Sequence, residues 1–118
     1  MALVEVEDLV VEYGGFRALH GMTCHIDAGV VGLLGPNGAG KSTLIKTLLG
    51  FNRPQAGRVR AFGRAMPAGT LHVRQQTGYM PEREVSSPKV SAVAFLTYCG
   101  RLFGMTRIDA MERAHAVL

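Results

Sequence analysis

The sequence predicts an α/β domain, and three patterns along the chain of 118 residues lead to this prediction. Residues 3–13 alternate apolar and acidic side chains with a period of two, which predicts a half-buried strand. Residues 30–34 are almost wholly apolar, which is typical of a strand covered on both faces in a parallel sheet. Residues 41–49 repeat leucine and isoleucine at four-residue spacing and end at Gly50, which predicts a helix and its C-cap.

Three shorter segments predict further strands. Residues 22–26 alternate apolar and polar side chains in the same way as the first strand. Residues 59–62 lie between two glycines, and residues 77–80 are closed by Pro81. Short apolar runs between such turn residues are the usual signal of a strand, so each of the two predicts one more.

The C-terminal third predicts two helices. Residues 91–105 carry apolar side chains at helical spacing, although Gly100 and Gly104 lower their helix propensity. Thr106 and Asp109 match the S/T-x-x-D/E capping pattern, which predicts that a last helix begins there. The predicted apolar stripes are Phe95, Tyr98, Leu102 and Met105 on the first helix, and Ile108, Met111, His115 and Leu118 on the second.

Composition and charge exclude several classes of protein. The chain is 47% hydrophobic and 19% charged, which is a globular profile. Its longest uncharged apolar-rich run, residues 90–100, is shorter than the roughly 20 residues that a membrane span needs. The net charge is +4, and a run of arginines has only Phe62 as an interleaved aromatic, so we do not expect nucleic-acid binding. These arginines are Arg53, Arg58, Arg60, Arg64 and Arg74.

Residues 35–43 read Gly-Pro-Asn-Gly-Ala-Gly-Lys-Ser-Thr and match the phosphate-binding pattern G-x-x-x-x-G-K-[ST]. Glycines let successive backbone N–H groups point at a polyphosphate, and the helix that follows adds its N-terminal partial positive charge. Lys41 would reach the β- and γ-phosphates, and the Ser42 hydroxyl would ligate Mg²⁺. The predicted ATP-binding residues of this loop are Gly35, Pro36, Asn37, Gly38, Ala39, Gly40, Lys41, Ser42 and Thr43.

In full, this loop resembles the Walker A motif of the ATP-binding cassette (ABC) ATPases. Tyr13 ends the first predicted strand within Tyr-Gly-Gly-Phe-Arg-Ala-Leu, which is similar to the family's A-loop. The resemblance implies that Tyr13 stacks on adenine, and such stacking is open to any base because every base has a π-face. Tyr13 is therefore added to the predicted ATP-binding residues.

The segment Gly-Tyr-Met-Pro-Glu at residues 78–82 resembles the Q-loop of the same family, which joins the core to a helical subdomain. The Q-loop usually carries Gln where this chain has Glu82. A carboxylate is also a hard oxygen ligand, so the resemblance implies that Glu82 contacts Mg²⁺ or its water. A solvated charged turn is the alternative reading of Glu82 that the sequence leaves open.

The resemblance implies that residues 1–118 are the N-terminal part of one ABC ATPase domain, with a P-loop NTPase fold. Residues up to about 90 would form an antiparallel β subdomain and a RecA-like core, and residues 91–118 would begin a helical subdomain. The sequence contains no Leu-Ser-Gly-Gly-Gln-type signature, no Walker B aspartate with its catalytic glutamate, and no switch histidine. We therefore expect ATP and Mg²⁺ as cofactors and assign no catalytic residue.

In the intact protein the resemblance implies ATP hydrolysis that powers transport through a partner membrane permease. A second ATP-binding subunit would close head to tail on the first, and both would lie on the cytoplasmic face of the membrane. The sequence leaves three alternatives open: a non-transport ABC ATPase of DNA maintenance or the ribosome, an inactive remnant, and a P-loop kinase. It indicates neither the transported substrate nor the direction of transport.

Overall fold

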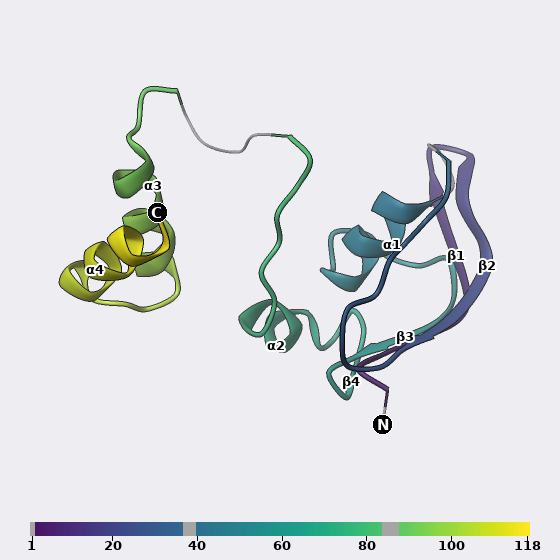
Figure 1. Cartoon of the computed structure of the whole chain (residues 1–118). Coiled ribbons are helices and arrows are strands. Elements are labelled where there is room, and N and C mark those ends of the chain that lie inside the picture. The colour runs from purple at the N-terminus through teal and green to yellow at the C-terminus, as the bar shows by residue number, and fades with distance from the viewer. Residues whose placement is uncertain (1, 37–39, 84–87) are drawn as a thin grey trace. The chain divides into compact units, whose positions relative to one another are not determined.

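The computed structural model describes residues 2–36, 40–83 and 88–118 (Figure 1). The chain divides into two compact units, Met1–Gly78 and Tyr79–Leu118. The described part of the first unit contains the strands β1 to β4 and the helices α1 and α2, and that of the second contains α3 and α4. Within the described residues, no helix combines the length and the apolarity that a membrane crossing needs.

The first unit is built on an antiparallel sheet with the strand order β2-β1-β3-β4. The predicted strands at 3–13, 22–26 and 59–62 are confirmed, although β2 begins at Phe16, earlier than predicted. The short β4 was not predicted. The strands are β1 (Val4–Tyr13), β2 (Phe16–Ile26), β3 (Ala56–Ala61) and β4 (Arg64–Ala65).

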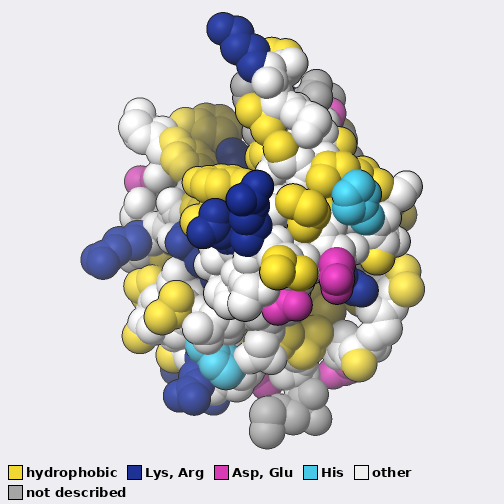
Figure 2. All heavy atoms as spheres, turned by 90° about the vertical axis from the view of Figure 1, so that its left-hand side faces the viewer, with side chains coloured by type: hydrophobic (Ala, Val, Ile, Leu, Met, Phe, Trp, Pro, Cys, Tyr) yellow, Lys and Arg dark blue, Asp and Glu magenta, His cyan; other side chains and the backbone are white. Residues whose placement is uncertain are grey.

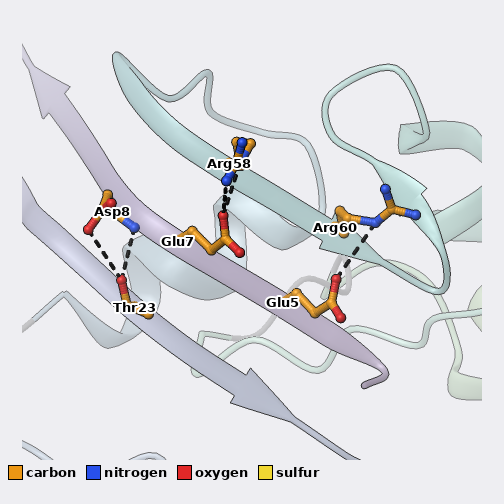
Figure 3. Close-up of polar contacts among 6 residues, drawn as sticks. All are labelled: Glu5, Glu7, Asp8, Thr23, Arg58 and Arg60. Atoms are coloured by element: carbon orange, nitrogen blue, oxygen red, sulfur yellow. Dashed lines mark hydrogen bonds and ion pairs between the residues drawn. The ribbon is translucent and has the colours of Figure 1, made fainter. Parts of the chain in front are cut away.

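Strand β1 has a bulge at Asp8, so the apolar residues before it and after it point to the same face of the sheet. Val6 and Leu9 are both fully buried, although their spacing would place them on opposite faces of a regular strand. Asp8 has a φ of 47°, and the register of β1 shifts there against both neighbouring strands. The Asp8 N–H donates to Thr23 Oγ1 at 2.9 Å, which supplies a partner across the bulge (Figure 3).

Gly57 makes this bulge possible from the β3 side. Its φ is 91°, which side-chain-bearing residues rarely adopt. A Cβ at Gly57 would overlap the backbone carbonyl oxygen of Asp8. Glycine at position 57 of β3 therefore leaves the space that the bulge in β1 occupies.

Helix α1 (Lys41–Leu48) covers the apolar face of the sheet and confirms the helix predicted at 41–49. Leu44 is 2% exposed and lies in one cluster with the sheet residues Val11 and Leu19. Gly50 follows the helix with a φ of 76°, as its predicted C-cap role requires. The cluster consists of Val4, Val6, Leu9, Val11, Leu19, Leu44, Val59, Ala61 and Val73.

The predicted strands at 30–34 and 77–80 are not formed. Val30 is fully exposed and Leu34 is 93% exposed, and the chain runs past the sheet there without pairing (Figure 1). Every pairing in the described sheet is antiparallel and involves only β1 to β4. A strand buried on both faces needs neighbours that bond its N–H and C=O groups, and no described strand supplies them to either segment.

These exposed apolar side chains predict self-association of the chain. An uncovered apolar segment with unpaired backbone groups is a template for pairing with another chain. We expect concentration-dependent dimers or larger species in sedimentation velocity, and fewer of them in a Val30→Thr/Leu34→Thr double variant. Leu71→Thr is the matched control, because Leu71 is 72% exposed on helix α2 (Thr70–Gln75). A monodisperse wild-type monomer with a cooperative melt would contradict this prediction.

The second unit is a pair of helices, α3 (Ala92–Leu102) and α4 (Arg107–Val117). Both helix predictions are confirmed, and so is the predicted cap of α4, because Thr106 Oγ1 accepts from the Asp109 N–H at 3.2 Å. Ser91 caps α3 in the same way, with its Oγ accepting from the Ala94 N–H.

Small residues lie where the two helices come close together. Ala110 and Ala114 are buried, and a Cβ at Gly100 would lie 3.0 Å from the Ala110 Cβ. Most of the stripe residues face solvent instead, for example Leu102 and Ile108 at 68% and 72% exposure. Figure 2 shows such hydrophobic side chains at the surface beside arginine and lysine. Glycine at position 100 thus permits the close approach of α3 and α4.

Candidate nucleotide-binding site

The start of helix α1 brings together the predicted phosphate-binding residues that the structure describes. Gly40 is the N-cap with a φ of 94°, and Lys41, Ser42 and Thr43 form the first turn. The first turn holds no acidic side chain. Its backbone N–H groups lack partners within the helix and carry the positive end of the helix dipole, so they suit an anion. Asn37, Gly38 and Ala39, also predicted, lie outside the described residues.

Lys41 folds its side chain back over the loop. Its Nζ donates a hydrogen bond to the carbonyl oxygen of Gly35, the first residue of the motif. Gly35, Pro36 and Ser42 are exposed, so solvent reaches the loop from its described ends. The ammonium group therefore sits at the loop, where the motif requires a cation for the phosphates.

Gly40 also joins the loop to the β1–β2 hairpin. A Cβ at this position would overlap Leu19 Cδ2 and would lie 3.1 Å from the Ala18 carbonyl oxygen. Glycine is therefore required at position 40 for both its backbone conformation and its closeness to β2. The N-terminal end of α1 is consequently held against the half of β2 that is nearest the hairpin turn (Figure 1).

Tyr13 is the last residue of β1 and is 43% exposed. It alternates in register with Leu9 and Val11, which are buried in the core, so its side chain projects from the same face of the sheet. Helix α1 covers that face through Leu44. The predicted adenine-contacting residue and the predicted phosphate-binding residues thus share one face of the first unit.

Polar residues behind the loop support helix α1, and sequence reasoning missed them. Thr47 is 1% exposed, and its Oγ1 donates to the Thr43 carbonyl at 2.7 Å. Asn52 Nδ2 lies 3.4 Å from the same carbonyl. Arg74 on α2 donates from Nε to the Leu49 carbonyl at 2.7 Å, so it binds the C-terminal end of the helix. The Thr47 bond lies within α1, whereas the Arg74 bond joins segments 25 residues apart, which no local sequence pattern indicates.

Glu82 belongs to the second unit and is exposed. Ser42 belongs to the first unit, and the predicted contact of Glu82 with Mg²⁺ stays a prediction. In the described part of the chain, no group of three or more histidine, cysteine, aspartate or glutamate side chains is arranged to hold a metal ion. Ser42 and Glu82 are the residues for which we predict metal contact.

The opposite face of the sheet carries a row of cross-strand ion pairs. Arg58 Nε donates to Glu7 Oε2 at 2.9 Å, and Arg60 Nε lies 3.7 Å from Glu5 Oε2 (Figure 3). Two arginines of the basic run are thus matched by carboxylates within the sheet.

The Glu7–Arg58 pair predicts a pH dependence of stability. The hydrogen bond from Arg58 and its charge lower the pKa of Glu7 below the ordinary value of 4.5. A carboxylate with a lower pKa in the folded chain stabilises the fold above its unfolded pKa and loses that effect as pH falls through the folded pKa. We expect the urea midpoint to fall less from about pH 6 to about pH 3 in Glu7→Gln than in wild type. Glu5→Gln is the control, because the Glu5–Arg60 pair is longer, at 3.7 Å. An equal change of the urea midpoint in Glu5→Gln would contradict the assignment of the pH dependence to Glu7.

The chain is similar to a known protein family and to known proteins. A family model described as ABC transporter matches residues 19–117. The chain is 34% identical to the Nod factor export ATP-binding protein I of Burkholderia lata, an alignment that covers all of this chain and 38% of the relative. It is 37% identical to the daunorubicin/doxorubicin resistance ATP-binding protein DrrA of Streptomyces peucetius, over 94% of this chain and 34% of that protein.

Solved structures show the same similarity. An ATP-binding subunit of an ABC transporter superposes with a TM-score of 0.74 at 33% identity, over 88% of this chain and 44% of that chain. A bacterial Atm1-family ABC exporter with ATP bound gives a TM-score of 0.72 at 29% identity, over 80% of this chain and 17% of that chain. The chain therefore spans less than half the length of each of these proteins.

Proposed function

This chain belongs to the ABC transporter family of ATP-binding proteins, and from that membership we propose that its first unit holds the phosphates and the adenine of ATP. The family and the P-loop NTPase fold class that the motifs predicted are confirmed. The single observation that carries the proposal is the start of α1, where Gly40 packs on β2 and Lys41 folds over the loop.

The phosphates are the best-supported part of the proposal. The N–H groups of the first turn of α1 would donate to phosphate oxygens in place of water. When ATP binds, Lys41 would give up its hydrogen bond to the Gly35 carbonyl and donate to the β- and γ-phosphates instead. These phosphates accept stronger, charge-assisted hydrogen bonds. The proposed contacts of the loop are those predicted at Gly35, Pro36, Asn37, Gly38, Ala39, Gly40, Lys41, Ser42 and Thr43.

Mg²⁺ fits the donor set at the start of α1. Ser42 is exposed in the first turn, and a hydroxyl oxygen is a ligand that this hard cation accepts. The ion supplies neutralisation of phosphate charge when it is bound. We assign Ser42 as its protein ligand in this unit, with Glu82 as a candidate contact to the ion or its water.

Tyr13 is the proposed adenine contact. It lies on the face that α1 covers, and nearly half of its surface is free for a base to stack on. Stacking of a base on an aromatic ring contributes about 1–3 kcal/mol. This contribution would hold the base while the loop holds the phosphates.

For the whole protein we propose ATP hydrolysis that drives transport through a partner permease, with a second ATP-binding subunit closing head to tail. The chain would then lie on the cytoplasmic face of the membrane, bound to the permease. Two relatives are named for export and for drug resistance, which supports transport outward.

Titration of the 118-residue chain with a fluorescent ATP analogue and Mg²⁺ tests the proposal. We expect saturable binding that ATP and inorganic tripolyphosphate displace, and we expect no multiple turnovers in a phosphate-release assay. The chain contains neither a Walker B nor a signature sequence to orient the attacking water. Absence of saturable binding would overturn the proposal, and turnovers that disappear in Lys41→Ala would overturn the second expectation.

A further inference from the structure

The hairpin turn next to the P-loop carries two aromatic side chains, of which the proposed function uses one. Tyr13 and Phe16 are register partners across the β1–β2 hairpin. The turn between them is Gly14-Gly15, with φ angles of 52° and 86°, which is the glycine conformation that tight two-residue hairpin turns require. Opposite residues of an antiparallel pair project from the same face of the sheet, so both rings lie on the face that α1 covers.

Phe16 takes no part in the hydrophobic core. It is 65% exposed, whereas Leu19 on the same strand is 4% exposed. The partly buried residues that pack against the core include Met22 and Cys24 of β2 but not Phe16. A large apolar ring is thus held in water next to Tyr13, so core packing does not account for it.

The turn end of the hairpin is held in register from its opposite face. Glu12 and Arg17 are cross-strand partners, and Arg17 Nη2 lies 2.9 Å from Glu12 Oε1. The Glu12 N–H also donates to Gln55 Oε1 at 2.7 Å, which ties the hairpin to the chain before β3. The two rings are therefore presented by an anchored backbone, which lowers the cost of ordering them around a ligand.

The phosphate loop lies within reach of this aromatic pair. Leu19, three residues after Phe16 on the same strand, is the residue that a Cβ on Gly40 would overlap. A nucleotide with its phosphates at the start of α1 would therefore have its base near the hairpin. Two rings on one face offer a purine more stacking surface than Tyr13 alone does.

We propose that Phe16 is a second base-contacting residue, which forms with Tyr13 a two-ring platform for the purine of the bound nucleotide. The proposal rests on the proposed ATP site and adds the residue that completes its base-binding part. Stacking does not read hydrogen-bond donors and acceptors, so the platform favours purine nucleotides over inorganic polyphosphate without separating ATP from GTP.

The test compares ATP, GTP and inorganic tripolyphosphate as ligands of the same chain by titration. We expect Phe16→Ala and Phe16→Leu to weaken ATP and GTP by roughly 5- to 100-fold and to leave tripolyphosphate within about twofold. Phe16→Tyr keeps the ring and is expected to retain the affinity. Phe103→Ala is the matched control, because Phe103 is 70% exposed in the second unit.

Each outcome separates the inference from the function on which it rests. Unchanged ATP affinity in Phe16→Ala, with a loss in Tyr13→Ala, overturns the platform and leaves the ATP site. Equal losses for ATP and tripolyphosphate in Phe16→Leu assign Phe16 a structural role and overturn the platform too. A wild-type chain that binds tripolyphosphate as tightly as ATP rejects both base contacts, and one that binds neither ligand rejects the proposed function itself.

Discussion

Replacing Lys41 with alanine is expected to weaken ATP binding by roughly 10- to 100-fold, because charge-assisted hydrogen bonds to the phosphates are lost. In the described part of the chain, Lys41 Nζ donates to the backbone carbonyl of Gly35. Lys41 is only half-buried and contributes nothing to the hydrophobic cluster, so the melting temperature should change little. Titration with ATP and a thermal melt measure the two effects.

Lys46→Ala is the matched control for this variant. Lys46 lies in the last turn of the same helix and is exposed, so its removal changes the net charge equally. Tripolyphosphate binding should fall with ATP binding in Lys41→Ala, in contrast to the Phe16 variants, because the proposed contact of Lys41 is with phosphate and not with the base. Equal affinities in the Lys41 and Lys46 variants would show that only general positive charge matters.

Replacing Leu44 with alanine is expected to lower the free energy of unfolding of the first unit by about 2–5 kcal/mol. Leu44 is 2% exposed and is the α1 residue of the cluster that joins the helix to the sheet. Its removal leaves a cavity between α1 and the strands, and the surrounding structure relaxes only partly to fill it. Because the same helix begins at Lys41, ATP affinity should fall together with stability.

Urea unfolding followed by circular dichroism measures this loss, with Ile45→Ala as the matched control. Ile45 is the next residue of α1 and is 39% exposed, so its truncation should cost clearly less. Equal losses for the two variants would mean that α1 does not pack on the sheet through Leu44. Addition of ATP should raise the urea midpoint of both variants, since a ligand that binds the folded state stabilises it.

Much of the candidate site could be predicted because its chemistry lies in a continuous segment. The proposed roles of the glycines, Lys41 and Ser42 rest on backbone conformation and on side chains of fixed reach, and both are readable from local spacing. The caps of α1 and α4 were predictable for the same reason, since Gly50 and Thr106 act on their own helix ends. Tyr13 needed the family resemblance, because a strand-end tyrosine by itself does not indicate a base.

Features that depend on distant partners could not be predicted in this way. The bulge at Asp8 depends on Gly57 of another strand, and the support of α1 by Arg74 joins segments on either side of β3. The sequence pattern indicates only that Gly100 lowers helix propensity, whereas the structure places it where α3 and α4 approach each other. Each of these roles exists only after the elements have packed together.

The sequence by itself therefore determined the phosphate-loop motif, the alternation of β1 and β2, and the helix ends at Gly50 and Thr106, because these follow from local spacing and backbone preference. Tertiary structure decided which apolar residues are buried. Residues 30–34 and the stripes of α3 and α4 have the composition of buried elements, yet most of their side chains face solvent. An apolar pattern indicates that a surface is suited to burial. Burial itself requires a partner surface, and only the fold shows whether one is present.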